Sequence, residues 1–251
     1  MRFHKGTTEM HDIEMTHTTN EFFECWRAAA MHINGLGTDE SFRWIKSELT
    51  PPYLEHLSFA LGNQLYFIHV VDVDKEASGP GNPGGLKWIA KDCNGYCCTM
   101  PMKQSEDGWK PAYSGWGILN TAGSELLSPP DLMTDENIVM TDWEVHEFAV
   151  QVICQSLESS GKTISAKSSA PDLDPSIWFE GPDGPEWIMI RSARYPSPDP
   201  ERPDNWDKLV EHVSKLSSTG HFTGVVLANP KDPNLPLRRG EPLNARFSGM
   251  E

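Results

Sequence analysis

Apolar and polar positions along the first half of the chain predict two helices followed by strands. The segment "NEFFECWRAAAMHI" (residues 20–33) predicts a helix that ends near Gly35 and Gly37. Residues 38–49 predict a second helix, with Thr38 as its N-cap and acidic residues in its first turn. The apolar, β-branched run at residues 65–74 predicts a central strand.

Asn94-Gly95 is the clearest turn signal of this half. It separates two strand-like runs in "LKWIAKDCNGYCCTMPM", which predicts a two-residue β-hairpin. Side chains alternate along strands, so Cys97 is expected on the face opposite Cys93 and Cys98, and a zinc site is not expected. Residues 103–140 are rich in glycine and proline, which indicates irregular structure.

The second half shows a stronger pattern. Thr141 and Glu144 have the spacing of a capping box at the start of a helix that ends at Gly161. Strands are predicted at residues 163–167, 176–181, 186–194 and 221–228, with a further strand near 244–249. A helix is predicted to start at Asp204 or Asn205. Its apolar face holds Trp206, Leu209, Val213 and Leu216.

These elements indicate an α/β or α+β fold. An antiparallel hairpin sheet with helices is expected in the N-terminal half, packed on a C-terminal core with the order αβββαβ. The expected boundaries are a polar lead-in at 1–20, an N-terminal half at 21–140 and a C-terminal half at 141–251. Because the capped helix follows the irregular segment directly, the halves are expected to form one compact unit.

Charge and composition narrow the function classes. Residues 1–160 hold 10 Lys/Arg against 23 Asp/Glu, a net charge of −13; residues 161–251 hold 11 against 13, a net of −2. This balance disfavours nucleic acid and permits a protein partner with a basic surface. No apolar run is long enough for a membrane span or a secretory signal, and five cysteines fit free thiols in the cytoplasm.

The segment "PDLDPSIWFEGPDGPEWIMIRSAR" (171–194), together with the αβββαβ order, resembles the core of metal-dependent nucleases with the PD-(D/E)XK signature. The resemblance implies that Asp172 or Asp174 is the first Mg²⁺ ligand, and that an acid and a Lys two residues apart follow on the next strand. Glu186 and Arg191 are the candidates there. Carboxylates that have moved to Glu144, Glu147 or Glu180 are the candidates for completing the metal site.

The strand at 186–194 departs from the signature. Trp187, Met189 and Arg191 are expected on one face, with Glu186, Ile188 and Ile190 on the other. If Arg191 takes the lysine position, Met189 takes the acid position, and a thioether does not hold Mg²⁺. The alternative for Arg191 is an ion pair.

Three functions therefore compete. The preferred hypothesis is a non-enzymatic cytoplasmic protein without a cofactor that binds a basic protein partner, for example an immunity or accessory protein. The second is a divergent Mg²⁺-dependent nuclease that uses Asp172 or Asp174 with Arg191. The third is an enzyme acting on a small molecule at a site that the sequence does not reveal.

Overall fold

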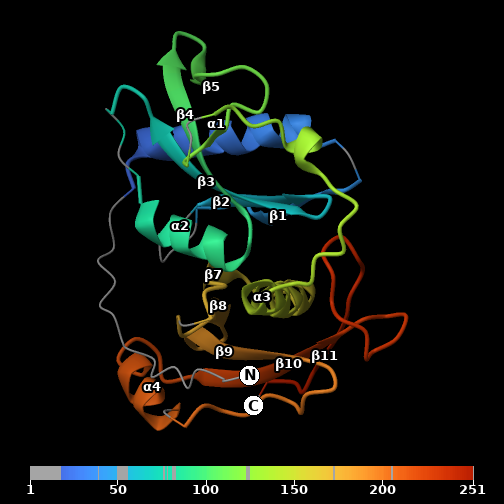
Figure 1. Cartoon of the computed structure of the whole chain (residues 1–251). Coiled ribbons are helices and arrows are strands. Elements are labelled where there is room, and N and C mark those ends of the chain that lie inside the picture. Colours follow the sequence, from blue (N-terminus) through green and yellow to red (C-terminus); the bar gives the residue numbers. More distant parts are fainter. Residues whose placement is uncertain are drawn as a thin grey trace. The chain divides into compact units, whose positions relative to one another are not determined.

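The structure is a computed structural model that describes residues 18–38, 40–49, 56–75, 77, 79–80, 83–122, 125–171, 173–204 and 206–250. Its backbone divides into two compact units. Residues 18–138 with 238–240 form the N-terminal unit, and residues 139–237 with 241–250 form the C-terminal unit. The predicted polar lead-in falls on residues of which only 18–20 are described, and Asn20 already begins a helix (Figure 1).

The N-terminal unit contains a mixed sheet with two helices. Its elements are α1 (Asn20–Leu36), β1 (Phe42–Lys46), β2 (Leu57–Leu61), β3 (Gln64–Asp72), α2 (Pro83–Asp92), β4 (Tyr96–Ser105), β5 (Gly108–Pro111), β6 (Leu119–Asn120) and a 3-10 turn at Pro129–Leu132. The strand order is β1-β2-β3-β4-β5, and β6 pairs with β4. The pairs β2–β3 and β4–β5 are antiparallel hairpins, whereas β3 and β4 run parallel with α2 as the crossover.

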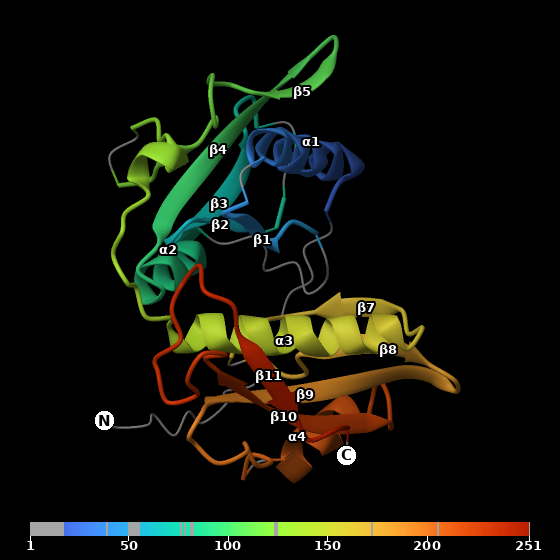
Figure 2. The ribbon, with the colours of Figure 1, turned by 90° about the vertical axis from the view of Figure 1, so that its right-hand side faces the viewer.

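Helix α1 confirms the first predicted helix. Thr19 is the N-cap and its side chain accepts a hydrogen bond from the Phe22 backbone N–H at 3.2 Å. One face of α1 is buried against β3, β4 and β5, as Figure 2 shows. The buried side chains on this face are Phe22, Cys25, Trp26, Ala29 and Ile33. Burial of this face gives the unit its core.

The helix predicted at residues 38–49 is wrong, because Phe42–Lys46 is strand β1. Phe42 and Trp44 project to the same side and pack on Phe59 of β2, with ring centroids 5.3 and 6.1 Å away, while Arg43 is exposed. Aromatic residues two positions apart suit a strand whose neighbour supplies a matching ring. The acidic residues Asp39 and Glu40 favour the start of a helix, but this local preference is weaker than the pairing of the aromatic side chains.

The hairpin predicted at Asn94-Gly95 is also wrong. Asn94 has a positive φ of 47°, its N–H binds the Lys91 carbonyl, and the Gly95 N–H binds the Ala90 carbonyl at 2.7 Å. These two bonds form a Schellman motif that ends α2. Both structures need a left-handed backbone at this dipeptide, so the dipeptide alone does not distinguish them. The expected alternation holds for Cys97 and Cys98 on β4, whereas Cys93 follows a helix.

Residues 103–140 are more regular than expected. The end of β4, the strands β5 and β6, and the 3-10 turn all lie in this segment. Trp116 belongs to the buried core, and Trp109 packs against it. Both tryptophans therefore contribute to the core of this unit.

The C-terminal unit follows the predicted element order. Its elements are α3 (Asp142–Ser159), β7 (Ile164–Lys167), β8 (Ile177–Gly181), β9 (Gly184–Arg194), α4 (Trp206–Val213), β10 (Gly220–Ala228) and β11 (Asn244–Phe247). The sheet order is β11-β10-β9-β8-β7, with β9 and β10 parallel and the other pairs antiparallel. The α/β fold class and the αβββαβ order are confirmed.

Side-chain alternation in β9 is confirmed by two separate cores. Ile188 and Ile190 pack in the core that contains α3, whereas Trp187 and Met189 pack in the core that contains α4. The Thr141–Glu144 capping box is present. Helix α4 ends at Val213, so Leu216 lies beyond it and is 75% exposed rather than on its apolar face. Of its two predicted first residues, Asp204 lies before the helix, which begins at Trp206, and Asn205 lies outside the described residues.

No helix within the described ranges is both long and apolar enough to cross a membrane.

Candidate functional site

Asp174 and Arg191 form the central polar contact of the C-terminal unit. The Arg191 guanidinium donates to both carboxylate oxygens of Asp174, at 2.9 and 2.5 Å, and also to the Ile190 carbonyl at 2.8 Å. The Asp174 side chain is 1% exposed and that of Arg191 is 23% exposed. The ion pair expected as the alternative role of Arg191 is therefore present. Because both oxygens of Asp174 bind the guanidinium, they are not presented to a metal ion.

The other nuclease candidates do not join this pair. Glu186 binds the His221 ring at 2.8 Å, on the face of β9 opposite Arg191 and about 16 Å along the strand at about 3.3 Å per residue. Glu180 is exposed on β8. Asp172 lies outside the described residues.

The two helix acids also have local roles. Glu144 accepts hydrogen bonds from the Thr141 N–H and hydroxyl at 2.8 and 2.9 Å, which completes the capping box. Glu147 accepts a hydrogen bond from Gln151 on the next turn at 2.9 Å. Throughout the part of the chain that the structure describes, no three His, Cys, Asp or Glu side chains are placed to share a metal ion.

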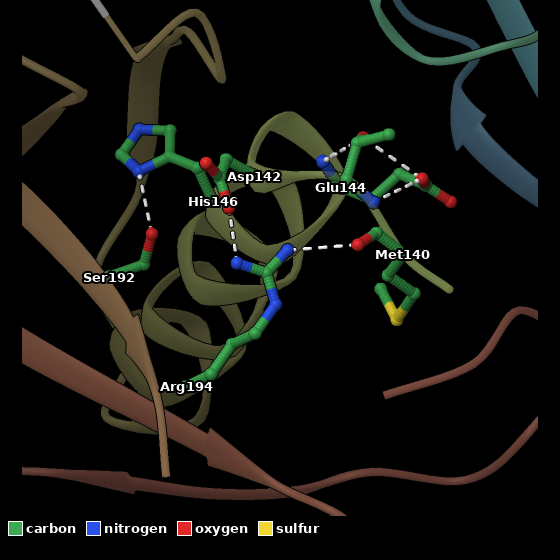
Figure 3. A network of polar contacts seen from close by, with 7 residues as sticks. Met140, Asp142, Glu144, His146, Ser192 and Arg194 are labelled. Atoms are coloured by element: carbon green, nitrogen blue, oxygen red, sulfur yellow. Dashed lines mark hydrogen bonds and ion pairs between the residues drawn. The ribbon is translucent and has the colours of Figure 1, made fainter. Parts of the chain in front are cut away.

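The start of α3 is joined to the end of β9 by a second polar network (Figure 3). Arg194 donates to the Asp142 carboxylate and to the Met140 carbonyl, the latter at 2.9 Å. One turn further along α3, the His146 Nδ1 lies 3.4 Å from the Ser192 hydroxyl. The His146 Nε2 is buried, and among the described residues no hydrogen-bond partner for it lies within reach.

His146 is a weak base in this position. Its pKa is lowered from 6.5 to about 4. Burial is the main cause, the positive charge of Arg191 adds to it, and the Asp174 carboxylate opposes both. A Ser–His pair that activates a nucleophile needs a contact of about 2.6–3.2 Å and a base whose pKa is near the working pH. The contact with Ser192 meets neither condition in this structure. The network joins α3 to β9.

A groove lies in the N-terminal unit, between α1 and the segment that begins with β1. Its volume is about 550 Å³, within the roughly 300–1,000 Å³ that ligand sites occupy. Most of its lining is apolar or aromatic. The lining includes Phe23, Trp26, Arg27, Met31, Trp44 and Leu49.

Two tryptophans hold the walls of this groove together. The Trp26 indole N–H, from α1, donates to the Ser47 carbonyl at 3.3 Å. The Trp44 indole N–H, from β1, donates to the Asn34 side chain on α1 at 3.1 Å. Trp44 is further fixed by Phe42, in an edge-on contact with ring centroids 5.3 Å apart. The groove is therefore already formed in the free protein, which lowers the entropic cost of binding.

The groove also exposes large apolar side chains. Phe23 is 51% and Met31 is 65% exposed. Together with Arg27 they are spaced four residues apart, so they form a second stripe along α1 beside its buried face. Sequence reasoning identified the helix but not this stripe, although the spacing of Phe23 and Met31 was the available signal.

The acidic excess does not belong to one structural unit. Residues 18–138 with 238–240 hold 10 Lys/Arg against 16 Asp/Glu, a net charge of −6. Residues 139–237 with 241–251 hold 9 against 17, a net of −8. A division at residue 160 assigns the acidic residues of α3 to the first half of the chain. This accounts for much of the difference between its net charge of −13 and the −6 of the N-terminal unit. Any electrostatic attraction of a basic partner therefore arises from the whole chain.

Comparisons with known proteins reach only the C-terminal unit. Residues 143–251 match the model of a domain of unknown function, DUF8840. The match begins in the first turn of α3 and includes every strand of the second sheet. No curated protein and no solved structure matches the chain.

Proposed function

We propose that this is a non-catalytic cytoplasmic protein that binds a protein partner, and that the groove beside α1 is its docking site. The observation that carries the proposal is a preformed apolar groove with Phe23 and Met31 exposed beside it. Exposed apolar surface of this kind is a feature of interaction sites, and aromatic and methionine side chains are enriched at their centres. Five free cysteines are consistent with a reducing compartment.

The state of the nuclease candidates supports a binding role. Asp174 is neutralised by Arg191, and Glu186 is engaged with His221 at the far end of β9. The αβββαβ order keeps a Mg²⁺-dependent nuclease as the second candidate. It is tested by incubating DNA and RNA with the protein and Mg²⁺ or Mn²⁺. We expect no cleavage above that of Asp174→Ala. Cleavage that this substitution abolishes, in a variant that circular dichroism shows to be folded, would establish the nuclease instead.

The net charge of −15 favours a partner with a basic surface through long-range attraction. An immunity or accessory protein that neutralises a basic toxin is one form of this function. Such attraction brings partners together and falls with salt, whereas the groove supplies the short-range contact.

Selection from a random peptide library displayed on phage tests the docking site. The full chain is immobilised, selected peptides are synthesised, and their Kd values are measured by fluorescence anisotropy. We expect Phe23→Ser with Met31→Ser to weaken binding at least about tenfold, since loss of one anchor at an interface centre costs more than about 1 kcal/mol.

The matched control is Tyr113→Ser with Leu126→Ser, two side chains of the same unit that are 45% and 53% exposed and lie outside the groove. These substitutions should leave the Kd unchanged. The docking site is refuted if no selected peptide loses affinity in the groove variant beyond its loss in the control.

A further inference from the structure

We infer that the groove binds a short partner segment in which apolar side chains flank a carboxylate, and that Arg27 binds that carboxylate. The inference rests on the proposed docking site and adds the chemistry of its ligand. It starts from the position of Arg27, which is four residues after Phe23 and four before Met31. The guanidinium therefore belongs to the same stripe of α1 as the two exposed apolar side chains.

Arg27 is available for such a contact. Within the described parts of the chain it has neither an ion-pair nor a hydrogen-bond partner, although Glu24 lies on the preceding turn of the same helix. Glu48, the other charged residue of the lining, has an interaction of its own within the protein. Arg27 is therefore the positive group that the described lining of the groove offers to a ligand.

The surroundings of Arg27 strengthen its preference for an acid. A guanidinium binds a carboxylate with two parallel hydrogen bonds, which fixes orientation as well as charge. Trp26 and Trp44 on the groove walls reduce the solvent around such a pair, and charge–charge interactions are stronger where water is excluded. A lysine or arginine in the same place would meet Arg27 and be repelled.

The size of the groove indicates a short segment rather than a folded surface. A volume of about 550 Å³ accommodates a few side chains, whereas stable contacts between folded proteins bury about 800 Å² on each partner. A linear segment places apolar anchors beside Phe23 and Met31 and its acid at Arg27 between them. The partner as a whole can still carry a positive net charge, because long-range attraction and the local contact involve different groups.

Charge reversal on both sides tests this pairing. The probes are the peptides selected on the full chain, together with versions in which the acidic residue is replaced by glutamine or lysine. We expect selected peptides to carry an acid between apolar residues and to bind Arg27→Glu at least about tenfold more weakly. The lysine version should recover affinity for Arg27→Glu while binding the wild type poorly.

Lys103→Glu is the control, because it changes the net charge by the same amount at an exposed position outside the groove. It should alter the Kd less than twofold, and thermal unfolding should show that Arg27→Glu remains folded. Groove-dependent peptides that are neutral or basic and indifferent to Arg27→Glu would overturn this inference and leave the docking site standing. Selection that yields no groove-dependent peptide would overturn both.

Discussion

Two Arg–Asp pairs in the C-terminal unit have similar geometry and different burial. Arg191 binds both oxygens of Asp174 at 2.9 and 2.5 Å, and Arg246 binds both oxygens of Asp199 at 3.0 and 2.5 Å. The Asp174 and Arg191 side chains are 1% and 23% exposed, whereas those of Asp199 and Arg246 are 47% and 66% exposed. Removing each aspartate therefore isolates the effect of burial.

Asp174→Ala should be strongly destabilising. Breaking a buried pair costs about 3–5 kcal/mol, because the remaining charge stays desolvated. Arg191 keeps part of its side chain in solvent and its bond to the Ile190 carbonyl, so we expect the lower end, about 3 kcal/mol of unfolding free energy. Asp199→Ala should cost about 0–1 kcal/mol, as exposed pairs do.

Urea denaturation followed by circular dichroism measures both changes. The double variant Asp174→Ala with Arg191→Ala should be more stable than Asp174→Ala alone, because it leaves no unpaired guanidinium. If Asp174→Ala costs no more than Asp199→Ala, the Asp174–Arg191 pair does not stabilise the fold. The Asp174 carboxylate would then not be held by Arg191 and would be available to a metal ion.

Three further predictions concern other buried contacts. Arg239 donates to the Cys93 and Asn94 carbonyls at the end of α2. Arg239→Met should therefore lower the free energy of unfolding by about 2 kcal/mol. Arg238→Met, at a half-exposed position, should change this free energy little. The pKa of His146 is lowered to about 4 in the folded protein. Its contribution to the free energy of unfolding is therefore complete above about pH 6.5 and is lost as the pH falls towards 4. His146→Gln should make the urea midpoint depend less on pH over this range. Thr141→Ala should remove about 1 kcal/mol by breaking the capping box, and Thr141→Ser should restore it.

The sequence predicted best where the deciding interactions are local. Thr141 and Glu144 are three residues apart, so the capping box that begins α3 depends on one turn of chain. The separation of Met189 from Ile190 in β9 follows from the alternation of every strand. Neither result depends on which neighbour the element meets.

The incorrect predictions share a different cause. Phe42 and Trp44 form a strand because β2 supplies Phe59 opposite them. Asn94-Gly95 ends α2 rather than turning a hairpin, and Arg239, from a segment far along the chain, binds the carbonyls there. In both cases two local structures have similar energies, and contacts that are remote in sequence select between them.

The amino-acid sequence by itself therefore determined the α/β class, the αβββαβ order, the capping box of α3 and the face on which each β9 side chain lies, because these follow from backbone geometry and short-range patterns. Only the tertiary structure decided that Arg191 binds Asp174, that Glu186 binds His221, and that Phe23, Arg27 and Met31 face a groove. A side chain's partner depends on long-range chain closure, and the spacing of residues along a strand or helix does not contain that information.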